Sequence, residues 1–428
     1  MKLAGSHDTG SLEMAEQQIA LRDRHNGWVF FMAFVLGFFA APVTYVGIVQ
    51  ATLCNKLGAS ATVSNLPLSG YLVANIAPLF AACWIPLRLE RAVVVWSNSI
   101  AAFLLTAVFV ALLLPLDRSI LLTIVIVQSL LMGIVSSLSG IYLYQCLGRG
   151  SSEAGRARAL KRTFTWGPLS AVAGSLLAQF ILNGGIPFLA FPSDFATLYL
   201  IGIPCRLTVA WATRQFDLPP IKDAPRRPFF PYITTSLREY LGSKPLLLLW
   251  VSFFLWYSTL NVLPNLSLYT RESMGRDPKE LAGLVMALRF GFKSMGGWFL
   301  GVASLRWGVR MPVMLTVVLV GSAALWASMV PGLPYLFAFG LMGAGELGGA
   351  YFLNYALALS TPATGARNLS IVNLATPLSS LTPAFHGRLA DRFGFLASFA
   401  CAFGTALVAL WLVARLPKTR DGGSTGTI

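Results

Sequence analysis

Residues 119 to 146 read SILLTIVIVQSLLMGIVSSLSGIYLYQC, a run of 28 residues without a charged side chain. About 20 apolar residues in a helix are enough to cross the hydrocarbon core of a bilayer, which is about 30 Å thick. The chain of 428 residues is 56% hydrophobic and only 11% charged, whereas soluble domains carry about 25% charged residues. This composition excludes an ordinary soluble enzyme and predicts an all-α polytopic membrane protein.

Apolar stretches of this kind occur twelve times along the chain. We place them at residues 27–52, 62–85, 92–114, 119–146, 166–184, 194–213, 246–269, 280–303, 312–331, 334–359, 368–386 and 394–415. A polar, proline-rich segment at 214–245 separates them six and six. We therefore expect two six-helix halves, a central cytoplasmic loop that holds at most a short surface helix over 232–242, and two tails; the five parts are 1–26, 27–213, 214–245, 246–416 and 417–428. The N-terminal tail is polar and is expected to be loose.

The net charge of +15 comes from 32 Lys and Arg against 17 Asp and Glu. With both termini in the cytoplasm, 22 of the 32 basic residues lie on cytoplasmic segments, 7 on outer loops and 3 within spans. This distribution follows the positive-inside bias. It predicts a multi-pass plasma membrane protein of the bacterial inner-membrane type, whose cytoplasmic face attracts anionic lipid headgroups. The chain contains no nucleic-acid recognition motif, and we expect no nucleic-acid partner.

The sequence offers little that resembles an enzyme. The five cysteines are widely spaced and form neither a metal pattern nor a disulfide framework, so we interpret them as apolar packing residues. Three histidines are too few for much chemistry, and the spans contain no nucleophile elbow or phosphate loop. We therefore predict no catalytic activity, no cofactor and no metal site.

A weak internal repeat supports the division into halves. Leu131, Met132 and Gly133 of the fourth span recur 210 residues later as Leu341, Met342 and Gly343 of the tenth. Pro168, Leu169 and Ser170 recur at a spacing of 209 residues as Pro377, Leu378 and Ser379. Such short matches arise by chance, but these lie at equivalent positions of the two predicted halves.

Three loops carry versions of the pattern G-x-L-x-D-R-x-G-R-R. The loop after the second span keeps Leu89, Glu90 and Arg91, and the loop after the eighth keeps Gly301, Arg306, Gly308 and Arg310. A fuller copy follows the eleventh span: Gly387, Leu389, Ala390, Asp391, Arg392, Phe393 and Gly394. With the 6+6 layout, these motifs resemble the major facilitator superfamily (MFS), a family of transporters.

The resemblance covers residues 27 to 416 and implies a fold, not a substrate. In this family the motif loops act as latches, through charge pairs that break when the protein changes state. We assign this gating role to Glu90, Arg91, Arg306 and Arg310, with Glu90 paired to a nearby arginine. For Arg306 and Arg310, surface charge that sets the topology is an equal alternative. We expect a monomer.

Within the spans, Glu346 is the one acidic residue, and Arg289 and Lys293 lie four residues apart on one face of the eighth span. Three uncompensated charges at mid-bilayer would cost about 8 to 10 kcal/mol, so they must be paired or hydrated. We interpret Glu346 as a proton carrier, and Arg289 and Lys293 as leaving one positive charge for an anionic substrate. The alternative is a fixed network that joins two helices. Arg206, in the sixth span, is expected to snorkel inward.

Six amide side chains within the spans are further candidates for substrate binding, with ordinary helix–helix contacts as the alternative. They are Gln50, Gln128, Gln145, Asn261, Asn265 and Asn354. The hypothesis is a secondary active transporter of a small solute, working by alternating access, coupled to protons and selecting an anion. Alternatives are a proton-coupled exporter of amphipathic compounds, or a transporter-like sensor that does not transport. The fourth span lacks the arginine typical of drug exporters of the family, which disfavours the first alternative.

Overall fold

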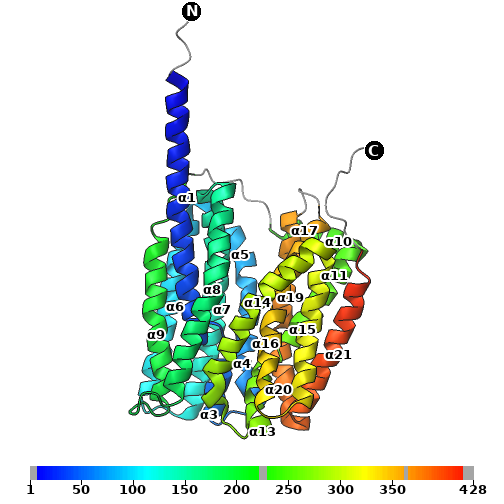
Figure 1. Cartoon of the computed structure of the whole chain (residues 1–428). Coiled ribbons are helices and arrows are strands. Elements are labelled where there is room, and N and C mark those ends of the chain that lie inside the picture. Colours follow the sequence, from blue (N-terminus) through cyan, green and yellow to red (C-terminus); the bar gives the residue numbers. More distant parts are fainter. Residues whose placement is uncertain (1–6, 221–228, 361–364, 418–428) are drawn as a thin grey trace, which may run out of the picture.

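The computed structural model describes residues 7–220, 229–360 and 365–417, and these residues form helices without a strand. Figure 1 shows two groups of helices side by side, α1–α9 and α11–α21, which are the N-terminal and C-terminal halves. Helix α1 begins and helix α21 ends at the same end of the molecule. We call this the proximal end and the opposite one the distal end. The fold class is the predicted one, an all-α membrane protein of two six-span halves.

The N-terminal half contains eleven helical segments up to the central loop. They are α1 (His7–Phe39), α2 (Ala41–Thr44), α3 (Ile48–Lys56), α4 (Ala61–Val73), η1 (Ala74–Ile76), α5 (Ala77–Trp84), η2 (Leu87–Leu89), α6 (Glu90–Leu113), α7 (Arg118–Gly150), α8 (Glu153–Leu182) and α9 (Ser193–Thr213). The central segment contains α10 (Phe229–Gly242), where the sequence allowed a short surface helix.

The C-terminal half follows the same plan. Its segments are α11 (Lys244–Leu260), α12 (Leu263–Leu268), α13 (Thr270–Met274), α14 (Pro278–Trp307), α15 (Arg310–Met329), η3 (Leu333–Leu336), α16 (Phe337–Gly345), α17 (Gly348–Ala358), α18 (Gly365–Asn373), α19 (Ala375–Leu378), η4 (Ser379–Leu381), α20 (Thr382–Phe393) and α21 (Phe395–Ala414). Among the described residues, eight helices or helix pairs are long and apolar enough to cross a membrane. The other four expected spans are either interrupted or, in α14, carry Arg289 and Lys293.

The interruption of the first span has a definite structure. Helix α2 ends at Thr44, helix α3 begins at Ile48, and residues 45–47 between them are not helical. The Gln50 side chain accepts a hydrogen bond from the Gly47 N–H (3.0 Å) and donates one to the Val43 carbonyl (3.1 Å). Broken helices are tolerated at membrane depth when side chains satisfy the freed backbone groups. The break leaves Tyr45 outside both helices, where it lines a cavity.

The expectation of a loose N-terminal tail is wrong for residues 7–26, which are the first part of α1. The side chain of Asn26 donates hydrogen bonds to the carbonyls of Gly150 (2.6 Å) and Asp217 (2.8 Å). The carboxylate of Asp23 accepts from the Ser152 N–H at 2.8 Å. These polar side chains satisfy backbone groups at the proximal ends of α7, α8 and α9 and so hold residues 23–26 of α1 against the N-terminal half.

At the distal end the two halves are in direct contact through α4 and α20. The carboxylate of Asp391 accepts hydrogen bonds from the N–H groups of Ala61 and Thr62, both at 2.9 Å, and so caps the first turn of α4. A Cβ atom on Gly387 would lie 2.7 Å from the Ala61 carbonyl oxygen. The glycine and the acid of the third motif copy therefore join α20 to α4.

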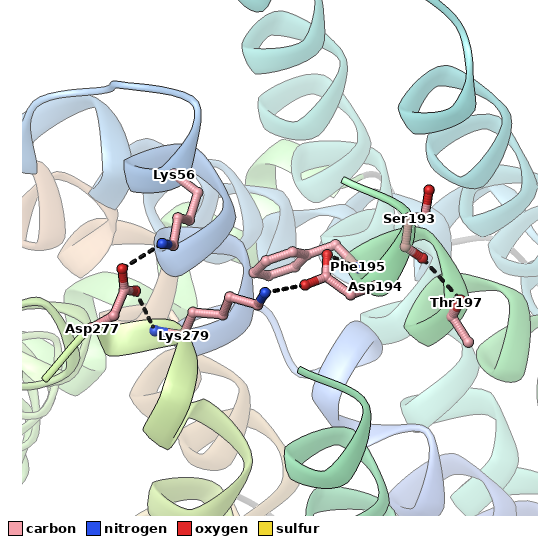
Figure 2. A network of polar contacts seen from close by, with 7 residues as sticks. All are labelled: Lys56, Ser193, Asp194, Phe195, Thr197, Asp277 and Lys279. Atoms are coloured by element: carbon pink, nitrogen blue, oxygen red, sulfur yellow. Dashed lines mark hydrogen bonds and ion pairs between the residues drawn. The ribbon is translucent and has the colours of Figure 1, made fainter. Parts of the chain in front are cut away.

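A network of charged side chains also crosses between the halves at this end (Figure 2). Lys56 at the end of α3 pairs with Asp277 before α14, and Lys279 at the start of α14 pairs with Asp194 at the start of α9. The Asp194 side chain is fully buried, and that of Lys279 is 19% exposed. We call these four residues the distal clasp, because each pair joins one half to the other.

Asp277 stays ionised in this arrangement. Burial works against its ionisation, but hydrogen bonds from the Lys56 side chain and the Lys279 N–H, with the charges of Lys56 and Arg271, lower its pKa below the ordinary value of 3.8. A carboxylate whose pKa is lowered on pairing keeps that pairing at all pH values above its ordinary pKa and loses it as the pH falls through the lowered one. The contact is therefore independent of pH near neutrality.

Removing the acids of the clasp is expected to open the distal end. The double variant Asp194→Asn, Asp277→Asn leaves Lys56 and Lys279 without their acidic partners. Spin labels are placed at positions 183 and 276, in opposite halves. The distance between them, measured by double electron–electron resonance, should increase in the double variant. Asp117→Asn, an exposed acid at the same end, is the matched control. An unchanged distance in the double variant would show that the clasp does not hold this end closed.

The same label distance should not vary in the unaltered protein between about pH 5 and about pH 8. The lowered pKa of Asp277 places its titration below that window. A distance that lengthens on going from about pH 8 to about pH 5 would contradict this assignment of the closing charge.

Candidate functional site

The three charges predicted at membrane depth meet in the C-terminal half. Glu346 lies in the break between α16 and α17, and one of its carboxylate oxygens pairs with the Arg289 guanidinium of α14. The other oxygen lies 3.1 Å from Lys293 Nζ. The side chains of Arg289 and Glu346 are 8% and 5% exposed, and that of Lys293 is 18% exposed. We call these three residues the charge triad.

Glycine makes the triad possible. A Cβ atom on Gly343 would lie 2.7 Å from the Cα of Arg289, closer than a real Cβ contact allows. Helices α14 and α16 therefore pack backbone against backbone at the residue that bears the guanidinium, as small residues permit between membrane helices. From the sequence, the glycines around Glu346 could either let helices approach closely or act as hinges. In the structure Gly343 lets α16 approach α14 closely.

The triad lies at the interface with the N-terminal half, because Tyr45 covers it. The Tyr45 ring centroid is 5.7 Å from the Arg289 guanidinium and 6.0 Å from Lys293 Nζ. The ring of Phe290 lies at the same distances on α14. A ring face attracts a cation at these distances, so the break in the first span brings an aromatic side chain of one half onto the bases of the other.

On the other side of Tyr45 is a cavity of about 290 Å³ in the N-terminal half. It is lined by side chains of α1, α2, α4, α6, α7 and α9 together with Tyr45: Ala33, Phe34, Gly37, Phe38, Thr44, Tyr45, Tyr71, Asn98, Ser136, Ser139, Gly140, Leu143, Tyr144, Arg206 and Val209. The guanidinium of Arg206 donates to Asn98 Oδ1 at 3.1 Å. The expected inward direction of Arg206 thus leads it into a cavity.

The sequence did not single out Asn98 or the aromatic lining. Asn98 was recognisable as an amide within the third span, as Arg206 was as a base within the sixth. Nothing in the sequence shows that these two positions, 108 residues apart, are in contact. Their pairing depends on how α6 packs against α9.

The six amides predicted to bind substrate are not gathered at this cavity. Gln50 holds the break in the first span. Asn261 donates hydrogen bonds to Ser379 and Thr382 within the C-terminal half. Asn265 donates to the His386 carbonyl (2.9 Å) and accepts from Asn65 (2.8 Å). Gln128 is buried beside Ser129. Gln145 and Asn354 are exposed. Most of these contacts are those of amides that join helices or satisfy backbone carbonyls.

The four residues predicted to gate lie at the proximal end, each in contact with its own half or exposed. Glu90, which is 1% exposed, pairs with Arg149 at 2.9 Å. Arg91 donates to the Phe216 carbonyl (3.1 Å), Arg310 donates to the Leu416 carbonyl (2.8 Å), and Arg306 is exposed. Glu90 thus has the arginine partner that the motif implied.

Comparison with known proteins gives the fold. No family model matches the chain, and no curated protein matches it in sequence. Solved structures match over nearly the whole chain: a D-xylose–proton symporter (TM-score 0.68, 13% identity, 92% of this chain and 98% of that one), the D323A mutant of the nucleoside transporter NupG (0.66, 12%, 92% and 99%) and a POT peptide transporter in complex with sulfate (0.66, 13%, 93% and 96%). The chain therefore has the fold of the major facilitator superfamily transporters.

Proposed function

We propose that this protein is a secondary active transporter that moves a small anionic solute together with protons by alternating access. The observation that carries the proposal is the charge triad, in which one acid is shared by two bases at the interface between the halves. The transporters of the same fold include a symporter named for protons and a peptide transporter in complex with sulfate, an anion. A proton and an anion are also the two ligands expected for the acid and the two bases of the charge triad.

The charge balance gives a coupling mechanism. With Glu346 ionised, the triad carries one net positive charge, and with Glu346 protonated it carries two. A protonated Glu346 therefore raises the affinity for an anion nearby. By linkage, a bound anion raises the affinity of Glu346 for a proton to the same degree. A proton and an anion that favour each other's binding are carried together.

The contacts between the halves support alternating access. The predicted topology makes the distal end the outer end, so the clasp and the Asp391 cap close the outside while the cavity serves the cytoplasmic side. In the opposite state these contacts separate and the proximal ends of the halves meet. We assign Glu90, Arg91, Arg306 and Arg310 to that second closure. This proposal includes a monomer in a bacterial-type inner membrane with both termini and an anionic lipid surface on the cytoplasmic side.

Replacing the acid tests the coupling. In proteoliposomes with an imposed pH gradient, Glu346→Gln should abolish gradient-driven accumulation of substrate while exchange of internal for external substrate continues, because only the proton carrier is lost. Glu272→Gln, an exposed acid at the distal end, should transport as the unaltered protein does. Accumulation that still follows the pH gradient in Glu346→Gln would remove Glu346 from the mechanism.

Chemical rescue separates a ligand site from a fixed network. Glu346→Ala leaves two bases without an acid, and removing one partner of a buried ion pair costs about 3–5 kcal/mol. If an anion enters this place from solution, formate should raise the unfolding temperature of Glu346→Ala well beyond its effect on the unaltered protein. Glu272→Ala is the control for general effects of salt. Absence of a specific formate effect would favour the fixed network.

A further inference from the structure

We infer that the cavity of the N-terminal half binds a substrate with an aromatic ring and one anionic group, an aromatic carboxylate in the simplest case, and that the anionic group binds Arg206. This inference names the substrate class of the site and rests on the proposed function for transport. Binding itself does not depend on proton coupling. Four features of the cavity support the inference.

The first feature is a base without an acid. Arg206 lies within α9, about 20 Å along the helix from Ser193, where a charge costs about 2.5–3.5 kcal/mol. Among the residues that the structure describes, no carboxylate pairs with it, and its buried Nε atom has no hydrogen-bond partner. Arg289 and Lys293, in contrast, share Glu346. Arg206 is therefore a further positive charge within the spans, separate from the surplus of the charge triad, and it lines the cavity.

The second feature is the way in which the guanidinium is held. The Asn98 amide nitrogen donates to the Val94 carbonyl at 2.9 Å and to the Ser139 hydroxyl at 2.8 Å. Both contacts use the NH₂ group, so the amide oxygen must face Arg206, and it accepts from the guanidinium at 3.1 Å. A neutral amide oxygen orients the guanidinium without neutralising it. The remaining N–H groups are free to form the paired hydrogen bonds that a carboxylate accepts.

The third feature is a continuous row of aromatic rings along the cavity. The Tyr144 and Phe34 ring centroids are 5.7 Å apart, those of Phe34 and Phe38 are 6.0 Å apart, and those of Phe38 and Tyr45 are 6.4 Å apart and stacked. Rings at such distances attract one another in offset or edge-to-face arrangements. A planar aromatic ligand can join this row, while a saturated ligand of equal size gains only the burial of its surface.

The fourth feature is the size and position of the cavity. Its volume of about 290 Å³ is just below the range of about 300–1,000 Å³ for small-molecule sites, which favours a molecule of one or two rings. Tyr45 lines the cavity and also contacts both bases of the triad. A ligand that touches Tyr45 therefore lies next to the groups whose charge changes when Glu346 binds a proton.

Three matched probes test the ligand class: 2-naphthoate, its neutral amide 2-naphthamide, and the saturated decahydro-2-naphthoate. Binding to the purified full-length protein is measured by isothermal titration calorimetry. 2-Naphthoate should bind at least about tenfold more tightly than 2-naphthamide, because the neutral amide cannot form the charged hydrogen bond with Arg206. It should also bind more tightly than the decahydro compound. Equal binding by all three, or by none, overturns the inference.

Variants of the base test the site. Arg206→Gln should weaken the binding of 2-naphthoate at least about tenfold and leave that of 2-naphthamide unchanged, while Arg206→Lys should retain part of the preference for the anion. Arg214→Gln, an exposed arginine at the end of the same helix, is the control. If Arg206→Gln does not fold, Arg206→Lys still tests the inference. If Arg206→Lys binds 2-naphthoate with unchanged affinity and keeps the full preference over 2-naphthamide, the paired N–H donors of the guanidinium do not bind the ligand and the inference is wrong.

The two proposals fail separately. If 2-naphthoate binds in an Arg206-dependent manner but no pH gradient drives its accumulation, the proposed transport function fails and the ligand class stands. If gradient-driven transport of another solute depends on Glu346 and is unaffected by Arg206→Gln, the transport function stands and the present inference is wrong.

Discussion

The arrangement of the helices at the centre of the molecule depends on the pairing of charged side chains within the membrane. Arg289, Lys293 and Glu346 together would be too costly at mid-bilayer unless they were paired, and each local feature around them serves that pairing. Gly343 lets the backbones of α14 and α16 approach closely, the end of α16 frees Glu346 from the regular helix, and Tyr45 covers the bases from the opposite half. Arg206 is held under the same constraint in another way, by an amide oxygen instead of an acid.

The sequence predicts the features that follow from local composition. Runs of apolar residues identify the spans, the proline-rich segment divides them into halves, and the scarcity of charge in the spans singles out Glu346, Arg289 and Lys293. The amides were less informative, because a side chain such as Asn261 that donates within its own half looks in sequence like one that faces a ligand. The cavity and the distal clasp were not predictable, since Asn98 and Arg206, or Lys56 and Asp277, come together only through packing of distant helices.

The third motif copy shows both the reach and the limit of motif reasoning. Its sequence indicates a loop motif at the predicted outer side but no partner. In the structure Asp391 caps α4, and Gly387 lets α20 approach the same turn. The acid caps a helix of the other half, with the helix dipole in place of a positively charged side chain.

The N-terminal extension of α1 has a mechanical consequence. Asn26 and Asp23 fasten α1 to the turn between α7 and α8 and to the segment after α9, so a rotation of one of these helices must carry the others with it. A half braced in this way resists shear between its own helices. In the alternating-access cycle proposed above, such a half would turn as one body, with the largest changes where the two halves are in contact.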